Sequence, residues 1–108
     1  MGAFNTVLLE MPCPNCRAIV PLVVQFKYGD CWQHEYVLGE TIGWGGNDVG
    51  RPGRRRVVVS GAGESCPRCG SNGDFCVFLF LDRLTSVEPD SGLHDFTAVD
   101  EPFIILEA

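Results

Sequence analysis

The chain has 108 residues and a formal net charge of −6, and 45% of its residues are hydrophobic. This length predicts a single domain, 1–108, with a modest core, and the composition excludes an intrinsically disordered chain. No apolar stretch approaches the length of a membrane span, and the acidic balance disfavours nucleic-acid binding that is independent of sequence.

Short runs rich in apolar and β-branched residues, separated by glycine, asparagine and proline, predict a series of strands. These are residues 4–10, 19–28, 32–38, 41–44, 55–60, 75–82 and 83–88, followed by an apolar run at 103–106. The strand 83–88 either continues the strand 75–82 or pairs with it as a hairpin. Because no segment shows sustained helical periodicity with capping residues, we expect an all-β fold with a mostly antiparallel sheet.

Proline and glycine predict where this strand pattern is interrupted. Pro21 has no backbone N–H to donate, so it predicts an edge or a bulge in the second strand. Gly29 and Asp30 predict a turn, and the glycine-rich stretch 45–53 predicts a loop.

Two matching turns organise the chain, with the sequences CPNC at 13–16 and CPRC at 66–69. Two cysteines separated by two residues can ligate one ion from a single turn, which the intervening proline partly preforms. Four thiolates are a standard set for structural zinc, so we predict one zinc ion bound by Cys13, Cys16, Cys66 and Cys69. Structural zinc contributes ~10–16 kcal/mol, which exceeds the ~3–4 kcal/mol cost of closing the loop between the turns. Gly70, directly after the second turn, predicts a positive φ.

Other interpretations of the cysteines stay open. Six cysteines could form disulfides in a secreted domain, although no signal peptide is evident and a cytoplasmic location is expected. Cys31 and His34 have a Cys-x2-His spacing and could combine with Cys13 and Cys16, but that set leaves the second CPxC turn unused. Cys76 lies in an apolar stretch and is expected to be a buried thiol.

Nothing in the sequence predicts an enzyme or a small-molecule substrate. A four-thiolate zinc site is closed, so it offers no open position for water or a substrate. His94 and Asp95 are candidates for a base, yet two polar residues in an acidic tail are the simpler interpretation. The chain has no motif for a nucleophile elbow, a phosphate loop or a metalloprotease helix.

A cluster of arginines suggests a binding surface. Arg51, Arg54, Arg55 and Arg56 follow Trp44 at the glycine-rich loop. Arginines on phosphates and an aromatic ring under a base would suit RNA or single-stranded DNA. The simpler interpretation is a solvated strand end that pairs with acidic residues, and the net charge favours a protein partner over nucleic acid.

The C-terminal region is acidic, since residues 82–108 contain seven acids and one base. Within it, Phe96 and the apolar run 103–106 could form a docking strand, either for a partner or for the chain's own sheet. Packing on its own sheet is the simpler interpretation. We therefore divide the domain into a core, 11–88, and an acidic extension, 89–108.

The order of the motifs carries a family resemblance. The first CPxC turn is followed by YGD at 28–30, YVLGE at 36–40, WGGNDVG at 44–50 and CPRCG at 66–70. Over residues 11–88 this order resembles a group of small bacterial zinc-ribbon proteins of uncharacterised role. The resemblance implies a zinc-ribbon β fold with the four CPxC cysteines as ligands, and no established activity. The turns are also similar to those of rubredoxin, an iron electron carrier, in which they lie closer together in the sequence.

These observations lead to one preferred function and two alternatives. We expect a non-catalytic, zinc-binding module that binds another protein. The alternatives are a zinc ribbon that binds nucleic acid through Trp44 and the arginines, and a rubredoxin-like electron carrier with iron at the same cysteines.

Overall fold

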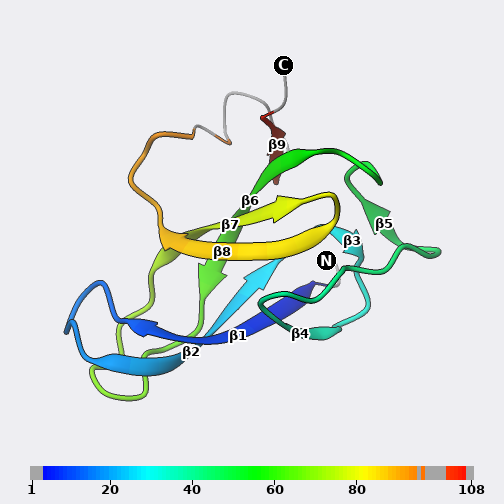
Figure 1. Cartoon of the computed structure of the whole chain (residues 1–108). Helices are drawn as coiled ribbons and strands as arrows, with labels where there is room; N and C mark the ends of the chain where they lie inside the picture. Colours follow the sequence, from blue (N-terminus) through cyan, green and yellow to red (C-terminus); the bar gives the residue numbers. More distant parts are fainter. Residues whose placement is uncertain (1–3, 95, 97–101, 107–108) are drawn as a thin grey trace.

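Strands dominate the computed structural model, which describes residues 4–94, 96 and 102–106 (Figure 1). The elements in the described residues are β1 (Asn5–Pro12), β2 (Ile19–Phe26), β3 (Gly29–Asp30), β4 (Glu35–Val37), β5 (Asp48–Val49), β6 (Arg56–Gly63), β7 (Asp74–Phe80), β8 (Arg83–Pro89) and β9 (Phe103–Ile105). This confirms the predicted all-β fold. In the part of the chain that is described, no helix is long and apolar enough to cross a membrane.

One large sheet has the strand order β4-β1-β2-β6-β7-β8, and β9 pairs with β6. All of its pairings are antiparallel except that of β1 with β4. This confirms the predicted, mostly antiparallel sheet. Along one edge, β6 pairs with β7; along the other, its first half pairs with β9 and its last residues pair with β2. The predicted apolar run at 103–106 therefore packs on its own sheet as β9.

The chain after β4 joins the two outer edges of this sheet. The Gly39 N–H donates to the Leu84 carbonyl, the Leu84 N–H donates to the Glu40 carbonyl, and the Ile42 N–H donates to the Asp82 carbonyl. Because β4 lies at one edge of the strand order and β8 at the other, these bonds wrap the sheet around the core.

The core lies inside the wrapped sheet and is made mainly of aliphatic and aromatic side chains. β2 shows how the pattern works: Val20, Leu22, Val24 and Phe26 are buried and alternate with more exposed residues, as one face of a strand requires. Pro21 lies on the exposed face, before the pairing of β2 with β6 begins at Val24. Pro21 pairs with Glu10 of β1 and has no strand pairing on its other side, which confirms the predicted edge position.

Several predicted element bounds are wrong. The predicted turn at Gly29 and Asp30 is the short strand β3, which pairs with β5 inside the predicted loop 45–53. The predicted strand 41–44 contains only an isolated bridge at Thr41. The predicted strands 32–38 and 75–82 are shortened to β4 and β7. Residues 83–88 form a hairpin with β7, which confirms one of the two predicted alternatives. Pairings of two or three residues leave no periodic pattern in a sequence, which explains the errors at β3, β4 and β5.

Tyr28 and Asn5 anchor the long excursion between β2 and β6. The Tyr28 ring is fully buried between the rings of Trp44 and Phe103, each at a centroid distance of 5.4 Å. The Tyr28 hydroxyl donates to the Arg51 carbonyl at 2.9 Å. The Asn5 side chain, also fully buried, donates to the carbonyl of Tyr28 at 3.1 Å. These contacts hold residues 28–53 against the end of the sheet.

Candidate metal centre

The two CPxC turns form the tips of two neighbouring hairpins. Residues 13–16 connect β1 to β2, and residues 66–69 lie between β6 and β7. Because β2 and β6 are paired, with Val24 opposite Gly63, the two tips lie side by side at the lower left of Figure 1. The strand order, rather than any local preference, thus brings together turns that are far apart in the sequence.

The two turns share the same backbone hydrogen bonds. The N–H of the residue after each second cysteine donates to the carbonyl of the first cysteine, from Arg17 to Cys13 and from Gly70 to Cys66, at 2.8 Å in both cases. Gly70 has a φ of 76°, which confirms the predicted left-handed conformation. Each turn therefore presents its two sulfur atoms on the same side, toward the other turn.

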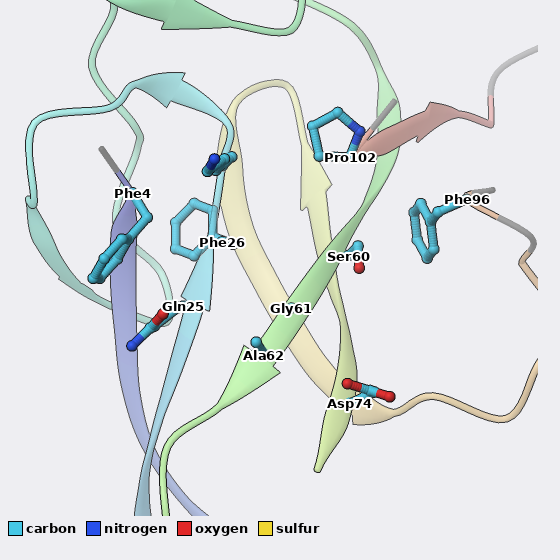
Figure 2. A pocket seen from close by; sticks show the side chains of 10 residues that line it. Phe4, Gln25, Phe26, Ser60, Gly61, Ala62, Asp74, Phe96 and Pro102 are labelled. Carbon is cyan, nitrogen blue, oxygen red and sulfur yellow. The ribbon is translucent and has the colours of Figure 1, made fainter. Parts of the chain in front are cut away.

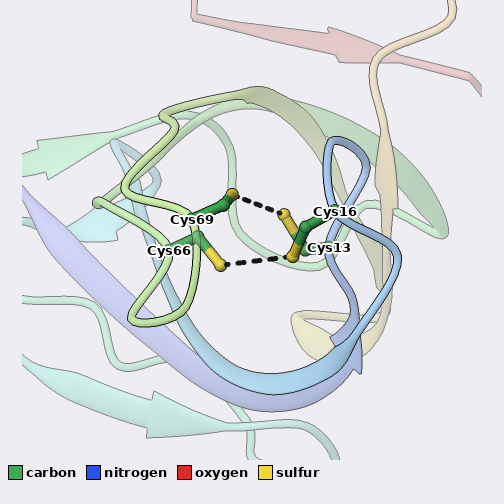
Figure 3. A group of neighbouring side chains, drawn as sticks. All are labelled: Cys13, Cys16, Cys66 and Cys69. Carbon is green, nitrogen blue, oxygen red and sulfur yellow. Dashed lines mark hydrogen bonds between the residues drawn. The ribbon is translucent and has the colours of Figure 1, made fainter.

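The four sulfur atoms form a compact cluster (Figure 3). The Sγ atoms of Cys13 and Cys69 are 3.8 Å apart, those of Cys16 and Cys66 are 3.9 Å apart, and all four lie within 4.8 Å of one another. A tetrahedral zinc site with bonds of ~2.3 Å has sulfur–sulfur edges of ~3.8 Å. All six cysteines are free thiols, so the structure does not support the disulfide alternative. The cluster has the dimensions of a site for one metal ion.

Polar groups around the cluster stabilise negative charge on the sulfurs. The Ser71 hydroxyl lies 3.2 Å from the Cys69 Sγ, and the Asn15 side-chain amide donates to the same sulfur at 3.5 Å. These two contacts, Ser71 first, lower the pKa of Cys69 to about 5. The backbone N–H groups of Cys16 and Asn15 lower the pKa of Cys13. At neutral pH, Cys69 is therefore a thiolate, which is the form that binds metal.

Cys16 shows the opposite effect. The Ala18 N–H acts to lower its pKa, but burial and the neighbouring thiols Cys13, Cys69 and Cys66 together raise the pKa of Cys16 to about 11. Several thiolates close together repel one another, so the cluster alone does not ionise fully. A divalent cation removes this repulsion and allows all four sulfurs to ligate as thiolates.

The space beside the four sulfur atoms is small. Cys13 and Cys66 are buried, Cys16 is half-buried and Cys69 is exposed. The hollow beside the sulfurs, walled by Leu22 and Phe75 among others, has a volume of about 40 Å³. This is about the space of a single water molecule.

The alternative ligand set with Cys31 and His34 is wrong. The Cys31 thiol is buried and donates to the Gly29 carbonyl at 3.4 Å, and the His34 ring lies 3.4 Å from the Asp30 carboxylate. Within the described residues, the four CPxC cysteines form the one group of metal-ligating side chains that is close enough to share an ion. Cys76 is buried, as predicted.

Trp44 and the arginines do not form a single exposed surface. Trp44 is half-buried, its ring meets the edge of Tyr28, and its indole N–H donates to the Asp82 carboxylate at 3.2 Å. The four neighbouring arginines are all exposed: Arg51, Arg54, Arg55 and Arg56. The ring that would stack on a base in the nucleic-acid alternative thus packs against the protein itself.

Of the two candidate residues for a base, the structure describes His94. The His94 ring packs against Phe78 at a centroid distance of 6.1 Å, and Asp95 lies outside the described residues. Phe96 lines a hollow of about 300 Å³ beside β6, together with Phe4, Phe26 and Pro102 (Figure 2). This hollow could not be predicted from the sequence, because its walls come from six separate segments.

Asn15 and Ser71 are the residues of the metal centre that the sequence analysis missed. Both approach sulfur atoms from positions inside or just after the CPxC turns. A polar residue between two cysteines, or two positions after the second, is the local signal that would have indicated them. Asn15 contacts a cysteine of the opposite turn, so its role depends on the tertiary contact between the two turns.

Comparisons with protein-family models, with curated proteins and with solved structures found no match to this chain. The resemblance to small bacterial zinc-ribbon proteins therefore stays a prediction. The chemistry of the four-sulfur cluster is the basis for inferring a function.

Proposed function

We propose that this chain is a non-catalytic module, stabilised by one structural zinc ion, whose role is to bind another protein. The observation that supports it best is the set of four sulfur atoms at tetrahedral spacing. Tetrahedral sites of four sulfurs suit zinc or iron, and a mononuclear structural site with only cysteine ligands is typical of zinc. Cys13, Cys16, Cys66 and Cys69 would supply all four ligands.

A structural role follows from the closed ligand set. Catalytic zinc keeps one position open for water or substrate, whereas four cysteines fill the coordination sphere. Glu64 is the acidic residue that lines the adjacent hollow, and its carboxylate accepts a hydrogen bond from the Gln25 side chain at 3.2 Å. The ion would act on folding, by tying the β1–β2 hairpin to the β6–β7 hairpin.

A protein partner suits the remaining surface better than nucleic acid. The chain is acidic overall, with a net charge of −6. Trp44, the aromatic ring nearest to the arginine cluster in the sequence, is engaged with Tyr28 and Asp82. Thiolate ligands persist in a reducing compartment, so we place the protein in the cytoplasm.

Metal analysis of the purified protein tests this function. We expect one zinc per chain by mass spectrometry, and a lower thermal unfolding midpoint after chelation. Iron in place of zinc, with the absorption bands of iron–thiolate bonds, would instead support the rubredoxin-like alternative. A chain that binds no metal, or that unfolds at the same temperature with and without it, would refute the structural role.

The protein-binding role needs its own measurement. Chemical cross-linking in cells of origin, followed by affinity purification at physiological salt, should recover a reproducible protein partner. If RNA or single-stranded DNA instead co-purifies with the chain, and this binding is lost when Arg54→Ala and Arg55→Ala are combined, the result would favour the nucleic-acid alternative.

A further inference from the structure

The turn between β7 and β8 contains a leucine in an unfavourable conformation. Leu81 and Asp82 form a two-residue hairpin loop with φ values of 51° and 68°. Such loops prefer asparagine, aspartate or glycine, because other side chains crowd the backbone when φ is positive. Asp82 suits the loop, and its carboxylate also accepts hydrogen bonds from the Gly53 N–H and the Trp44 indole. Leu81 is a poor choice for this backbone.

The Leu81 side chain is also exposed to solvent, with 56% of its surface accessible. It therefore contributes little to the core, although it holds a strained backbone position. Strain at one residue is a reason to look for a function there. An exposed leucine at a backbone position that disfavours leucine indicates a contact with another molecule.

Leu81 lies at the rim of an open groove. The groove has a volume of about 590 Å³ and is lined by Leu38, Gly39, Phe80, Leu81, Arg83, Leu84 and Thr85. Phe80 and Leu38 are exposed by 40% and 37%. Arg83 is the one charged side chain in this lining. We call these seven residues the apolar groove.

Two arginines lie on either side of Phe80 in the sheet. In the sheet register, Phe80 lies opposite Arg56 of β6 and opposite Arg83 of β8. Residues directly opposite in antiparallel strands share a face, with Cβ atoms ~4.5–5.5 Å apart. The Arg83 Nε also donates to the Gly39 carbonyl at 3.0 Å, which holds its guanidinium at the rim. An exposed aromatic ring is thus framed by two cations.

The segment that contains the other arginines is attached to the same turn. The Leu81 N–H donates to the carbonyls of Arg54 and Arg55, at 3.2 and 3.1 Å. Arg54, Arg55, Arg56 and Arg83 are four of the chain's eight lysines and arginines, and they lie at or beside this turn together with the acidic Asp82. The apolar groove combines aliphatic surface with a cationic frame.

We propose that the apolar groove binds an acidic segment of a partner protein that also carries apolar side chains. The apolar side chains would lie against Leu81, Phe80 and Leu38, and carboxylates would pair with the guanidinium groups of Arg56 and Arg83. This inference rests on the proposed protein-binding function and names the chemistry of the partner.

Charge and shape favour such a peptide over nucleic acid. Three of the seven lining residues are leucines, a composition that suits leucine-like side chains better than stacked bases. A second hollow shares Phe80 and Thr85 with the apolar groove, and its lining includes Glu88 as well as Arg56. The Glu88 carboxylate would repel a continuous line of phosphates. A short acidic segment carries fewer charges than a line of phosphates, so it meets less of that repulsion when its carboxylates lie at Arg56 and Arg83.

Fluorescence anisotropy with a defined probe tests the proposal. The probe is a fluorescein-labelled peptide of glutamates and leucines, titrated with the metal-loaded full chain at physiological salt. We expect saturable binding, and a loss of affinity of about tenfold or more when Arg56→Glu and Arg83→Glu are combined. Lys27→Glu is the control for charge reversal, because Lys27 is exposed and lies outside the groove. It should bind nearly as the unchanged chain does.

Leu81→Asn separates binding from folding. Asparagine tolerates a positive φ, so this variant should unfold at the same temperature as the unchanged chain or higher. Its affinity for the peptide should nevertheless fall about fivefold or more, because the exposed apolar contact is lost. A peptide in which serine replaces leucine should show a similar loss.

Three results would overturn the proposal. The first is that the unchanged chain does not bind the peptide. The second is that Leu81→Asn and the double arginine variant bind the peptide as tightly as the unchanged chain does. The third is that a single-stranded oligonucleotide at equal concentration displaces the peptide. The metal content of each sample distinguishes the two levels of inference. Peptide binding without bound metal would refute the structural zinc and leave the groove assignment standing, whereas one zinc per chain without peptide binding would refute the groove alone.

Discussion

Arg17 and Gly70 occupy equivalent positions in the two metal-binding turns, with φ values of 64° and 76°. The N–H of each donates to the carbonyl of the first cysteine in its turn at 2.8 Å. A left-handed backbone is easy for glycine and unfavourable for arginine by ~1–2 kcal/mol. The first turn therefore holds a conformation that its own residue disfavours, and the second does not.

This difference predicts that Arg17→Gly stabilises the protein by about 1 kcal/mol, because glycine relieves the strain. Thermal unfolding of the metal-loaded chain measures the effect. The converse change, Gly70→Ala, should lower the unfolding midpoint, although the added Cβ would meet no atom within 4 Å. Equal midpoints for the two variants would show that the φ values do not control stability at these turns.

Removal of one ligand should unfold the protein. Cys66→Ser leaves three thiolates, so the affinity for zinc falls and the two hairpins are no longer tied together. We expect less than one zinc per chain and a circular dichroism spectrum without the native β signal. Cys76→Ala is the matched control, because Cys76 is also a buried thiol but lies outside the cluster. It should keep one zinc per chain, and a loss of zinc in this variant would contradict the assignment.

The thiol pKa values predict how many protons zinc displaces. At pH 7, Cys69, with a pKa of about 5, has already lost its proton, whereas Cys16, with a pKa of about 11, still carries one. Zinc binding at pH 7 should therefore release at least one proton and fewer than four. Calorimetry in buffers of different ionisation enthalpy measures this number.

The same values give the direction of the pH dependence. As the pH falls through about 5, Cys69 gains a proton in the metal-free chain. More protons must then be displaced by zinc, so the affinity decreases and the number released rises. Release of four protons at pH 7 would show that Cys69 is not ionised before zinc binds.

Gly50 should tolerate no side chain. A Cβ at this position would lie 2.1 Å from a ring carbon of Tyr28, and φ is +100°. Gly50→Ala should therefore destabilise the protein by about 2–4 kcal/mol, from overpacking and backbone strain together. Urea unfolding followed by intrinsic fluorescence measures this loss. Gly46→Ala is the control, because a Cβ there meets no atom within 4 Å, and it should change stability much less.

The metal ligands could be predicted from the sequence because the chemistry of each half-site is local. Two cysteines and a proline within four residues specify a turn that presents two sulfurs, wherever the turn lies in the fold. The longer strands could also be predicted, since β2, β6 and β7 are dense in apolar and β-branched residues. These features depend on residues close together in the chain.

The roles of Trp44, Asn5 and Leu81 were decided only by the tertiary structure. Trp44 packs on Tyr28 and bonds to Asp82, and Asn5 bonds to the carbonyl of Tyr28. These partners come from strands and loops that meet only after the sheet has wrapped around its core. Leu81 has a positive φ and lies beside Arg54 and Arg55, and no local sequence pattern indicates either feature. Contacts between distant segments depend on strand order and register, and these are set by the packing of the whole sheet.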